Sequence, residues 1–399
     1  MQLDLFDTTN TDYLLVDLFR AYFDARKNKR NTINALSFEL HFERNLFELY
    51  DEIVAHAYEP KPSICFIVNK PVKREIFAAD FRDRVVHHLL YNYIAGIFDN
   101  TFINDSYSCR KLKGTHYAIK RVDHFIRSCS LNYSVDCYIL KLDIKGYFMA
   151  MNKELLCRKI EATLARKWSR IRCDRELLQE LINKTIFCDP ANNCIIKCKS
   201  GDWDELPITK SLFHSSEGCG LPIGNLTSQL FANIYLNEFD HFVKRELCIR
   251  YYGRYVDDII LVHRDREHLK RCIPKIRKKL KHEYKLELHP DKIYLQHYSK
   301  GVKYLGVMIK PRRIYIARRT KGNFYEAIIK HNVIAEKRVP SDKERKEFVS
   351  TMNSYLGLLR HYKTFKMRKM MFKNRLSPEW WKYVHTNCEF TKVTKRPLA

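Results

Sequence analysis

Two adjacent acids, Asp257 and Asp258, stand between two apolar runs, and this feature constrains the fold more than any other in the sequence. Two tyrosines at 251–252 precede the pair and the apolar run 259–262 follows it, so residues 249–263 are predicted to form two short strands around a turn. Burying two carboxylates costs several kcal/mol unless something pairs with them. A divalent cation would do so, although a hairpin turn with aspartate at its bend is a common alternative.

A third acid, Asp143, ends the apolar stretch 137–144, which is predicted to be a buried strand. If this strand neighbours the hairpin, Asp143 and Asp257 can share Mg²⁺ ions, because Mg²⁺ prefers oxygen ligands. Two such ions, about 3.5–4 Å apart, stabilise both the attacking and the leaving oxygen of a phosphoryl transfer. The three acids together therefore predict a two-metal site, more specifically than the tandem pair does alone.

The charge of the chain indicates a polyanionic partner. Lys and Arg number 72 against 46 Asp and Glu, which gives a net charge of +26. Residues 301–399 alone hold 24 basic and 7 acidic residues, a net of +17. A solvated surface is the alternative explanation, but an excess of this size is typical of proteins that bind nucleic acid. We therefore expect a polyanion to lie against the C-terminal part.

The cysteines and the apolar runs suggest where the protein resides. The 13 cysteines are an odd number and are scattered, which favours reduced thiols over a disulfide framework. Four of them could form a zinc site, but their spacing differs from that of common zinc knuckles: Cys188, Cys194, Cys198 and Cys219. No run of about 18 apolar residues is present, and the acidic N-terminus lacks a signal pattern. These features predict a cytoplasmic protein without membrane association.

The order of predicted elements is mixed, with helices and strands interleaved around an antiparallel sheet. Helices are expected over 11–57, 82–98, 152–167, 227–247 and 264–283, and from 322 to the end. Strands are expected over 63–79, 137–144, 249–263, 285–297 and 302–309, with a polar hairpin or loop at 186–213. This pattern predicts an α+β fold.

At this point the sequence resembles a family. Tyr255-Val256-Asp257-Asp258 resembles the Y-x-D-D signature of reverse transcriptases, and the run from Asp143 to Phe148 resembles their first catalytic motif. Residues 221–229 (LPIGNLTSQ) resemble the motif that lies between these two. The likeness extends from about residue 73 to at least 359.

The resemblance implies a right-hand polymerase with fingers, palm and helical thumb. Its lobes would be an N-terminal helical extension at 1–60, fingers at 61–138, a palm at 139–309 that contains the polar insertion 186–213, and a basic helical thumb at 310–399. It implies two Mg²⁺ ions, replaceable by Mn²⁺ in vitro, as cofactors. Their ligands would be Asp143, Ile144, Asp257 and Asp258.

The resemblance also assigns residues that contact the substrates. Phe148 would exclude the 2′-hydroxyl, the group that distinguishes RNA from DNA at a site, although a core role is the alternative. The remaining nucleotide-binding residues would be Lys73, Arg74, Arg110, Gly224, Asn225, Ser228 and Gln229. Helix capping would explain Asn225 and Ser228 equally well, and a solvated strand face would explain the basic pair at 73–74.

Other residues would serve the primer strand and the proton transfers. Lys292 matches a family lysine near the leaving pyrophosphate and would act as a proton donor, although lysines are abundant in this chain. The primer and template would contact Tyr255, Tyr304, Leu305 and Gly306. Residues 354–359 resemble the thumb helix that lies on the duplex.

The third motif suggests the subclass. It reads Ile223-Gly224-x-x-x-Ser228-Gln229, where many reverse transcriptases have Gln before the Gly and Pro after the Ser. This variant, together with residues 21–31, resembles the enzymes of diversity-generating retroelements, which are bacterial or phage-encoded. Those enzymes copy a template-repeat RNA into cDNA with errors at adenines, and work with a small, basic, oligomeric accessory protein. The expected partners are thus template RNA, RNA–cDNA duplex, dNTPs and such a protein.

Two alternatives remain open at the level of the sequence. The first is a phage-defence reverse transcriptase, since some of those enzymes share the altered motif. The second is a non-catalytic RNA-binding or maturase-like protein on the same fold. The intact acids argue against the second alternative, because a pure binder gains nothing from three clustered acids facing a polyanion. About 90 residues follow the primer-grip match, enough for a thumb and little else.

Overall fold

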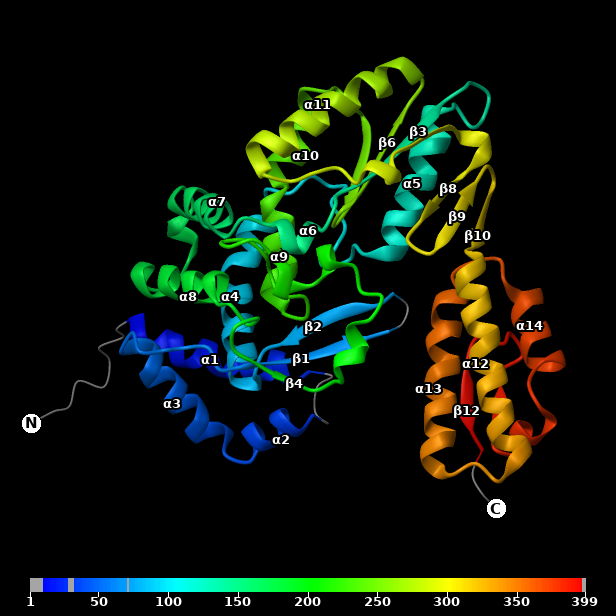
Figure 1. Cartoon of the computed structure of the whole chain (residues 1–399), viewed down its shortest axis with the longest axis horizontal. Helices are drawn as coiled ribbons and strands as arrows, with labels where there is room; N and C mark the ends of the chain where they lie inside the picture. Colours follow the sequence, from blue (N-terminus) through cyan, green and yellow to red (C-terminus); the bar gives the residue numbers. More distant parts are fainter. Residues whose placement is uncertain (1–9, 28–31, 70–71, 397–399) are drawn as a thin grey trace, which may run out of the picture. The chain divides into compact units, whose positions relative to one another are not determined.

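The computed structural model describes residues 10–27, 32–69 and 72–396, and combines helices with several small sheets (Figure 1). The predicted α+β class is confirmed. The chain divides into two compact units. The larger unit consists of Met1–Gly114 and Leu140–Leu295, and the smaller unit consists of Thr115–Ile139 and Gln296–Ala399. The four predicted lobes, with boundaries at 60, 138 and 309, are a different division that these two units do not test, so they stay a prediction.

The larger unit contains most of the helices. They are α1 (Asn10–Arg26), α2 (Ile33–Glu39), α3 (Phe42–Val54), α4 (Phe81–Asp99), α6 (Tyr147–Ala150), α7 (Lys153–Ala165), α8 (Arg175–Phe187), α9 (Leu226–Tyr235), α10 (Asn237–Arg245) and α11 (Arg266–Tyr284). Side-chain caps begin several of them, because a cap satisfies one of the free amides of the first turn. Asp80 caps α4, Asn152 caps α7 and Asp265 caps α11. None of the described helices is both long and apolar enough to reach across a bilayer.

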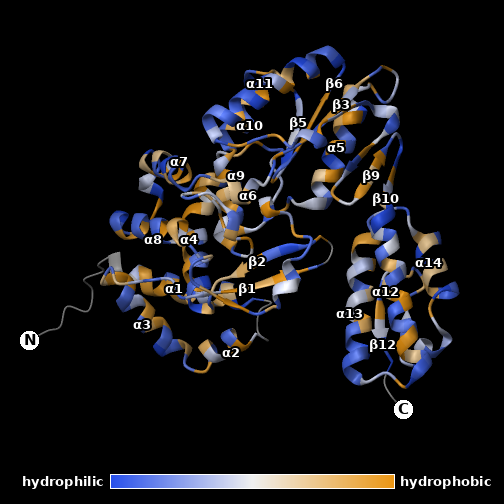
Figure 2. Cartoon of the chain, in the orientation of Figure 1, coloured by the Kyte–Doolittle hydropathy of each residue, from blue (hydrophilic) through white to orange (hydrophobic). Residues whose placement is uncertain are grey.

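Two sheets organise this part of the chain. In the first, β1 (Ser63–Val68) pairs with β2 (Arg74–Ala78) in antiparallel fashion and with β4 (Cys194–Ile196) in parallel fashion. The second has the order β5-β6-β3-β7, formed by β5 (Tyr251–Tyr255), β6 (Asp258–His263), β3 (Tyr138–Asp143) and β7 (Tyr294–His297). Figure 2 shows the apolar character of β3 and β6 against the largely hydrophilic α11.

The smaller unit joins a sheet to a helical bundle. Its elements are α5 (Thr115–Cys129), β8 (Val302–Tyr304), β9 (Val307–Lys310), β10 (Arg313–Ile316), α12 (Arg318–Lys337), α13 (Asp342–Leu359), α14 (Phe365–Asn374), β11 (Val384–Thr386) and β12 (Val393–Lys395). The bundle has its own core, in which the rings of Phe348 and Trp380 stack with centroids 4.1 Å apart. Ser341 and Glu344 form a capping box at the start of α13.

Three predicted elements were wrong in detail. The long helix expected over 227–247 breaks at Leu236, whose φ of −102° and ψ of 10° leave the helical region. The strand expected over 285–297 is reduced to β7, because Pro290 lacks an amide hydrogen for a ladder and begins a 3₁₀ turn instead. The C-terminal region is not helical throughout, since β11 and β12 form an antiparallel hairpin there.

Candidate active site

The tandem acids lie at a tight hairpin turn between β5 and β6. Tyr255 pairs with Asp258 across the hairpin, so Val256 and Asp257 alone form the turn. Val256 has a φ of +58°, which is rare for a β-branched residue. Strain of about 1–3 kcal/mol at such a residue persists only where the surroundings impose it, and it is concentrated at functional sites. The turn therefore depends on contacts from elsewhere in the fold.

Asp143 lies beside this turn because β3 is the neighbour of β6 in the sheet. The Ile144 amide donates to the Asp257 carbonyl oxygen at 3.3 Å, and the His289 amide donates to the Asp143 carbonyl oxygen at 2.8 Å. The structure thus brings together acids that are more than a hundred residues apart in the sequence. Ile144 itself is buried.

Two lysines form ion pairs with Asp143 and Asp258, called here the outer acids, whose charges act on the more buried Asp257. Lys292 places its Nζ 2.6 Å from Asp143 Oδ2, and Lys141 places its Nζ 2.8 Å from Asp258 Oδ1. Sequence reasoning singled out Lys292 but missed Lys141. The period of two in a strand could have found it, because Lys141 precedes Asp143 by two residues on β3 and so shares its face.

Burial and repulsion act most strongly on Asp257. Burial raises the pKa of its carboxyl to about 6, and the charges of Asp258 and Asp143 add to the rise. Burial by itself lowers the pKa of Lys292, but the hydrogen bond and charge of Asp143 outweigh it, so the net pKa is raised. The site therefore concentrates negative charge that a cation would relieve.

The chemistry of the three acids, although not their arrangement in this structure, suits a hard divalent cation. Asp143, Asp257 and Asp258 offer carboxylate oxygens, the ligands that Mg²⁺ prefers. In the arrangement described, Lys141 and Lys292 each occupy an oxygen of an outer acid. Within residues 10–27, 32–69 and 72–396, no three His, Cys, Asp or Glu side chains are grouped closely enough to hold a metal ion. The metal ligands thus stay a prediction. Cys188, Cys194, Cys198 and Cys219 are free cysteines and form no such group among the described residues.

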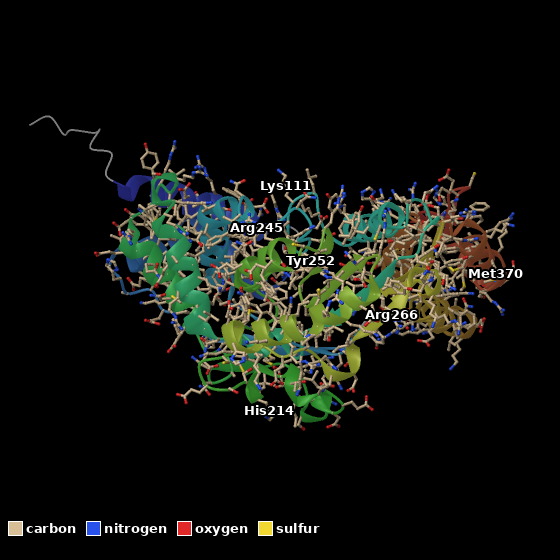
Figure 3. All side chains as sticks on the ribbon, turned by 90° about the horizontal axis from the view of Figure 1, so that it is seen from above. Lys111, His214, Arg245, Tyr252, Arg266 and Met370 are labelled. Atoms are coloured by element: carbon tan, nitrogen blue, oxygen red, sulfur yellow. The ribbon has the colours of Figure 1, made fainter. Side chains whose placement is uncertain are left out.

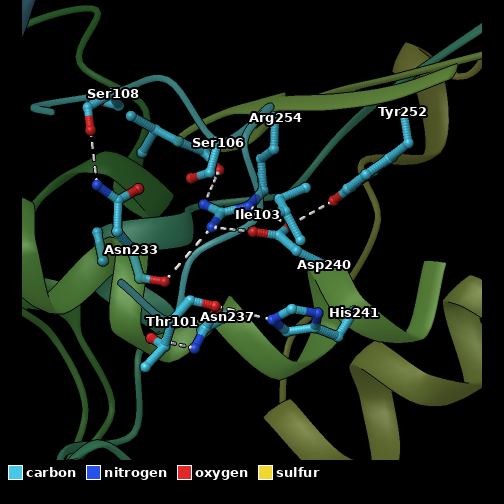
Figure 4. Close-up of polar contacts among 12 residues, drawn as sticks. Thr101, Ile103, Ser106, Ser108, Asn233, Asn237, Asp240, His241, Tyr252 and Arg254 are labelled. Atoms are coloured by element: carbon cyan, nitrogen blue, oxygen red, sulfur yellow. Dashed lines mark hydrogen bonds and ion pairs between the residues drawn. The ribbon is translucent and has the colours of Figure 1, made fainter. Parts of the chain in front are cut away.

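A buried ion pair supports the hairpin turn from within (Figure 4). The Arg254 guanidinium donates to Asp240 from Nε and from Nη2, each at 2.7 Å, and neither side chain is exposed. Its Nη1 donates to the Val256 carbonyl oxygen at 3.1 Å, and Tyr252 Oη donates to Asp240 at 2.5 Å. Tyr252 is fully buried, whereas Lys111 is exposed and is seen at the upper edge of the molecule in Figure 3. Sequence reasoning missed this pair, although a charged residue within an apolar strand is a signal for one.

The motif of residues 221–229 is attached to β2. The Phe77 amide donates to the Ile223 carbonyl oxygen at 2.9 Å, and the Ala79 amide donates to Asn225 Oδ1 at 3.2 Å. Gly224 has a φ of +134°, and a Cβ there would lie 2.8 Å from the Phe77 carbonyl oxygen. Asn225 makes no side-chain cap on α9. The capping explanation for Asn225 is therefore wrong, and glycine is required at 224 by close backbone approach.

The other residues assigned to nucleotide binding differ in their exposure. Ser228 is buried. Gln229 is exposed, and its Oε1 accepts a hydrogen bond from the Cys109 thiol at 2.7 Å. Phe148 is half-buried at an apolar cluster. Lys73 donates to the Asp204 carbonyl oxygen, and Arg74 is exposed.

Arg110 is held by its own neighbourhood. Its side chain is only 7% exposed and bonds Asp99 at 2.5 Å through Nε. Its Nη1 donates to the carbonyl oxygens of Ile103 at 2.7 Å and Ser106 at 2.9 Å. These contacts fix the guanidinium within its own loop, and the nucleotide-binding role of Arg110 stays a prediction.

One of the residues predicted to contact the primer lies in the larger unit, and the other three lie in the smaller unit. Tyr255 is half-buried at the end of β5. Tyr304 is buried at the end of β8 in the smaller unit. Leu305 and Gly306 follow it with φ values of +45° and +85°, and form the two-residue turn between β8 and β9. Positive φ at both positions is typical of the turns that close hairpins.

Comparison with known proteins decides the family. Residues 68–309, more than half of the chain, match the family described as reverse transcriptase (RNA-dependent DNA polymerase). The chain belongs to the reverse transcriptase family. This membership confirms the predicted enzyme class. The match contains residues 143–148, 221–229 and 255–258, which carry the predicted motifs.

This reverse transcriptase is also similar in sequence to one bacterial protein and in structure to two telomerases. It is 24% identical over 292 residues to Protein YkfC of Escherichia coli strain K12, which covers 65% of this chain and 69% of that protein. Its fold is similar to apo telomerase of Candida tropicalis (TM-score 0.45, 13% identity, 67% of this chain and 59% of that chain). It is also similar to telomerase of Candida albicans in complex with a fragment of telomeric RNA (TM-score 0.45, 11% identity, 79% and 57%). The chain thus spans under two thirds of these telomerase chains.

Proposed function

We propose that this reverse transcriptase copies an RNA template into DNA by two-metal-ion nucleotidyl transfer at Asp143, Asp257 and Asp258. The observation that carries the proposal is the junction between the end of β3 and the β5–β6 turn, where the Ile144 amide bonds the Asp257 carbonyl oxygen. This junction supports a shared cation, because it brings Asp143 to the turn that carries the tandem acids.

In this reaction the acids, two lysines and one aromatic ring would each have a separate role. The three carboxylates would hold Mg²⁺, with Mn²⁺ as a substitute, and these ions would stabilise charge on the attacking and leaving oxygens. Lys292 keeps its proton, because Asp143 raises its pKa. It would thus offer positive charge and a proton to the leaving pyrophosphate. Lys141 would hold Asp258 in orientation, and Phe148 would exclude a 2′-hydroxyl from the sugar site.

The partners follow from the same chemistry. The substrates would be dNTPs, template RNA and the growing RNA–cDNA duplex. The net charge of +17 over residues 301–399 supports contact between the smaller unit and a nucleic-acid backbone.

As the finer function we propose cDNA synthesis for a diversity-generating retroelement, with errors at adenines and a small, basic accessory protein. The support is the altered motif Ile223-Gly224-x-x-x-Ser228-Gln229. Its segment is bonded to Phe77 on β2 through Ile223, and to Ala79 just after β2 through Asn225. A phage-defence reverse transcriptase is the second candidate. Sequencing of cDNA made on RNA transcribed beside the gene separates them: errors confined to adenines support the first, and accurate copies or errors at all bases contradict it.

Primer extension on an RNA template tests the polymerase itself. Wild-type protein should incorporate dNTPs in the presence of Mg²⁺, and Asp257→Ala should abolish incorporation while circular dichroism and melting show an intact fold. Asp291→Ala is the matched control, because Asp291 is exposed and lies outside the three acids. Equal activity in wild-type and Asp257→Ala protein would contradict the proposed mechanism, as would equal losses in both variants.

A further inference from the structure

The polar segment 186–213, called here the insertion segment, is built into the β2-β1-β4 sheet, whose strand β2 begins at Arg74 directly after Lys73. Its strand β4 pairs with β1 in parallel register, with Ser63 opposite Cys194 and Cys65 opposite Ile196. The Lys197 amide then donates to the Cys65 carbonyl oxygen at 2.9 Å. The insertion segment therefore contributes the third strand, β4, to this sheet and is not a free loop.

A buried acid on β2 fastens the rest of the insertion segment. Glu75 is 1% exposed, and each of its three hydrogen-bond donors comes from that segment. Trp203 Nε1 donates to it at 2.7 Å, Ser211 Oγ at 2.9 Å and the Leu212 amide at 2.6 Å. Burying a carboxylate is tolerable when its oxygens are fully hydrogen-bonded. Glu75 thus fixes both ends of the stretch 203–212 against the strand that follows Lys73.

The same segment reaches the residues assigned to the nucleotide. Trp203 and Phe148 both pack against one apolar cluster, which is composed of Cys65, Phe77, Met149 and Leu212. The Asp204 carbonyl oxygen accepts a hydrogen bond from Lys73. Gly146, three residues after Asp143, approaches the segment so closely that a Cβ there would lie 2.8 Å from the Thr209 carbonyl oxygen.

We propose that the insertion segment is the supporting wall of the nucleotide site, with Trp203 and Glu75 as positioning residues that act through Phe148 and Lys73. This inference rests on the proposed function. A ring can exclude a 2′-hydroxyl only if it cannot recede, and close packing behind it prevents that movement. Removing the Trp203 ring leaves space into which the cluster and Phe148 can relax. Sugar selectivity then weakens before the fold is lost.

The ratio of kcat/KM for a dNTP to that for the matching rNTP measures this support. Trp203→Ala should lower the ratio about tenfold, equivalent to about 1.4 kcal/mol, whereas Trp203→Phe retains a ring against the cluster and should lower it less. Trp168→Ala is the control, because Trp168 is a half-buried tryptophan outside both the cluster and the insertion segment. Equal ratios in Trp203→Ala and Trp168→Ala would overturn the inference.

Phe213→Ala is a second test of the inference that should disturb the fold less than Trp203→Ala does. Phe213 is 38% exposed, and its ring lies 5.5 Å from that of Phe77 and 6.2 Å from that of Trp203. Phe213→Ala should lower the ratio in the same direction. Phe47→Ala should not, because Phe47 is also an exposed phenylalanine but lies on α3, where its ring pairs with that of Phe19. An unchanged ratio in Phe213→Ala would overturn the inference. Absence of dNTP incorporation by wild-type protein would instead contradict the proposed function.

Discussion

Asp240 on α10 binds Arg254 on β5 through two hydrogen bonds of 2.7 Å, in a place where neither side chain reaches solvent. The pair leaves one guanidinium nitrogen to donate to the Val256 carbonyl oxygen. Burial lowers the pKa of Arg254, but Asp240 outweighs it, so the net pKa is raised and the arginine stays charged. The turn that carries Asp257 is therefore held by a fully buried charge pair.

Asp240→Asn should lower the free energy of unfolding by about 3 kcal/mol, because it leaves a buried arginine without its counter-ion. Denaturant unfolding measures the loss. The double variant Asp240→Leu with Arg254→Met should recover much of that stability, since apolar replacement of a buried pair is often neutral. Its kcat should remain low, because the Val256 carbonyl has lost its donor. Recovery of kcat together with stability would show that the pair does not position the turn.

Val256→Gly should raise the free energy of unfolding by up to about 1 kcal/mol, because glycine adopts positive φ without the steric cost that valine bears there. We expect kcat to fall at the same time, since the more flexible glycine holds Asp257 less firmly. Thermal melting and primer extension on the same preparation measure the two effects. A stabilised variant with unchanged kcat would show that the backbone strain at Val256 plays no part in catalysis.

His87 on α4 should make stability depend on acid pH. Its Nδ1 lies 2.6 Å from Thr227 Oγ1, and burial, followed by the charges of His88 and Arg84, lowers its pKa to about 3. Between pH 6.5 and 3 the unfolded state binds the extra proton, so stability falls as pH falls, by up to about 1.4 kcal/mol per pH unit.

Denaturant titrations of His87→Gln should show a shallower loss of stability over this pH window than the wild type. His124→Gln is the control, because His124 is an exposed histidine on α5. If the free energy of unfolding of His87→Gln fell with pH as steeply as that of the wild type, groups other than His87 would cause the acid sensitivity.

Phe148→Ala should raise ribonucleotide incorporation relative to deoxynucleotide incorporation by about tenfold or more, the equivalent of about 1.4 kcal/mol of lost discrimination. Single-nucleotide extension with a dNTP and its rNTP on one primer–template measures the ratio. The same change should leave the KM for the RNA template unaltered. An unchanged ratio would return Phe148 to a purely structural role in its apolar cluster.

Binding to an RNA–DNA duplex should weaken steeply with salt, because lysines and arginines that neutralise phosphates release counterions. Lys366, Lys369 and Lys373 are exposed on α14 at helical spacing. Replacing all three by Gln should reduce the slope of log K against log[salt] by roughly 0.9 for each phosphate that is no longer neutralised. The matched control removes Lys270, Lys275 and Lys278 from α11, which are equally exposed in the larger unit. Equal changes in both variants would exclude a specific role for the smaller unit.

Local patterns in the sequence were sufficient for several features. The apolar residues on both sides of Asp257 and Asp258 predicted two strands and a turn, and the apolar run before Asp143 predicted β3. Such patterns work because side-chain periodicity follows from backbone geometry within a few residues. The break at Leu236 was missed, because the hydrophobic face of residues 227–247 continues through it.

The sequence by itself determined which acids could carry catalysis and which segments form strands and helices, since these depend on neighbours in the chain. Only the tertiary structure decided that β3 lies beside β6, that Lys141 bonds Asp258, and that Asp240 binds Arg254. It also decided that Glu75 fastens the insertion segment more than a hundred residues away. Pairings of this kind depend on how distant segments pack, because a buried charge selects whichever partner the fold brings within reach.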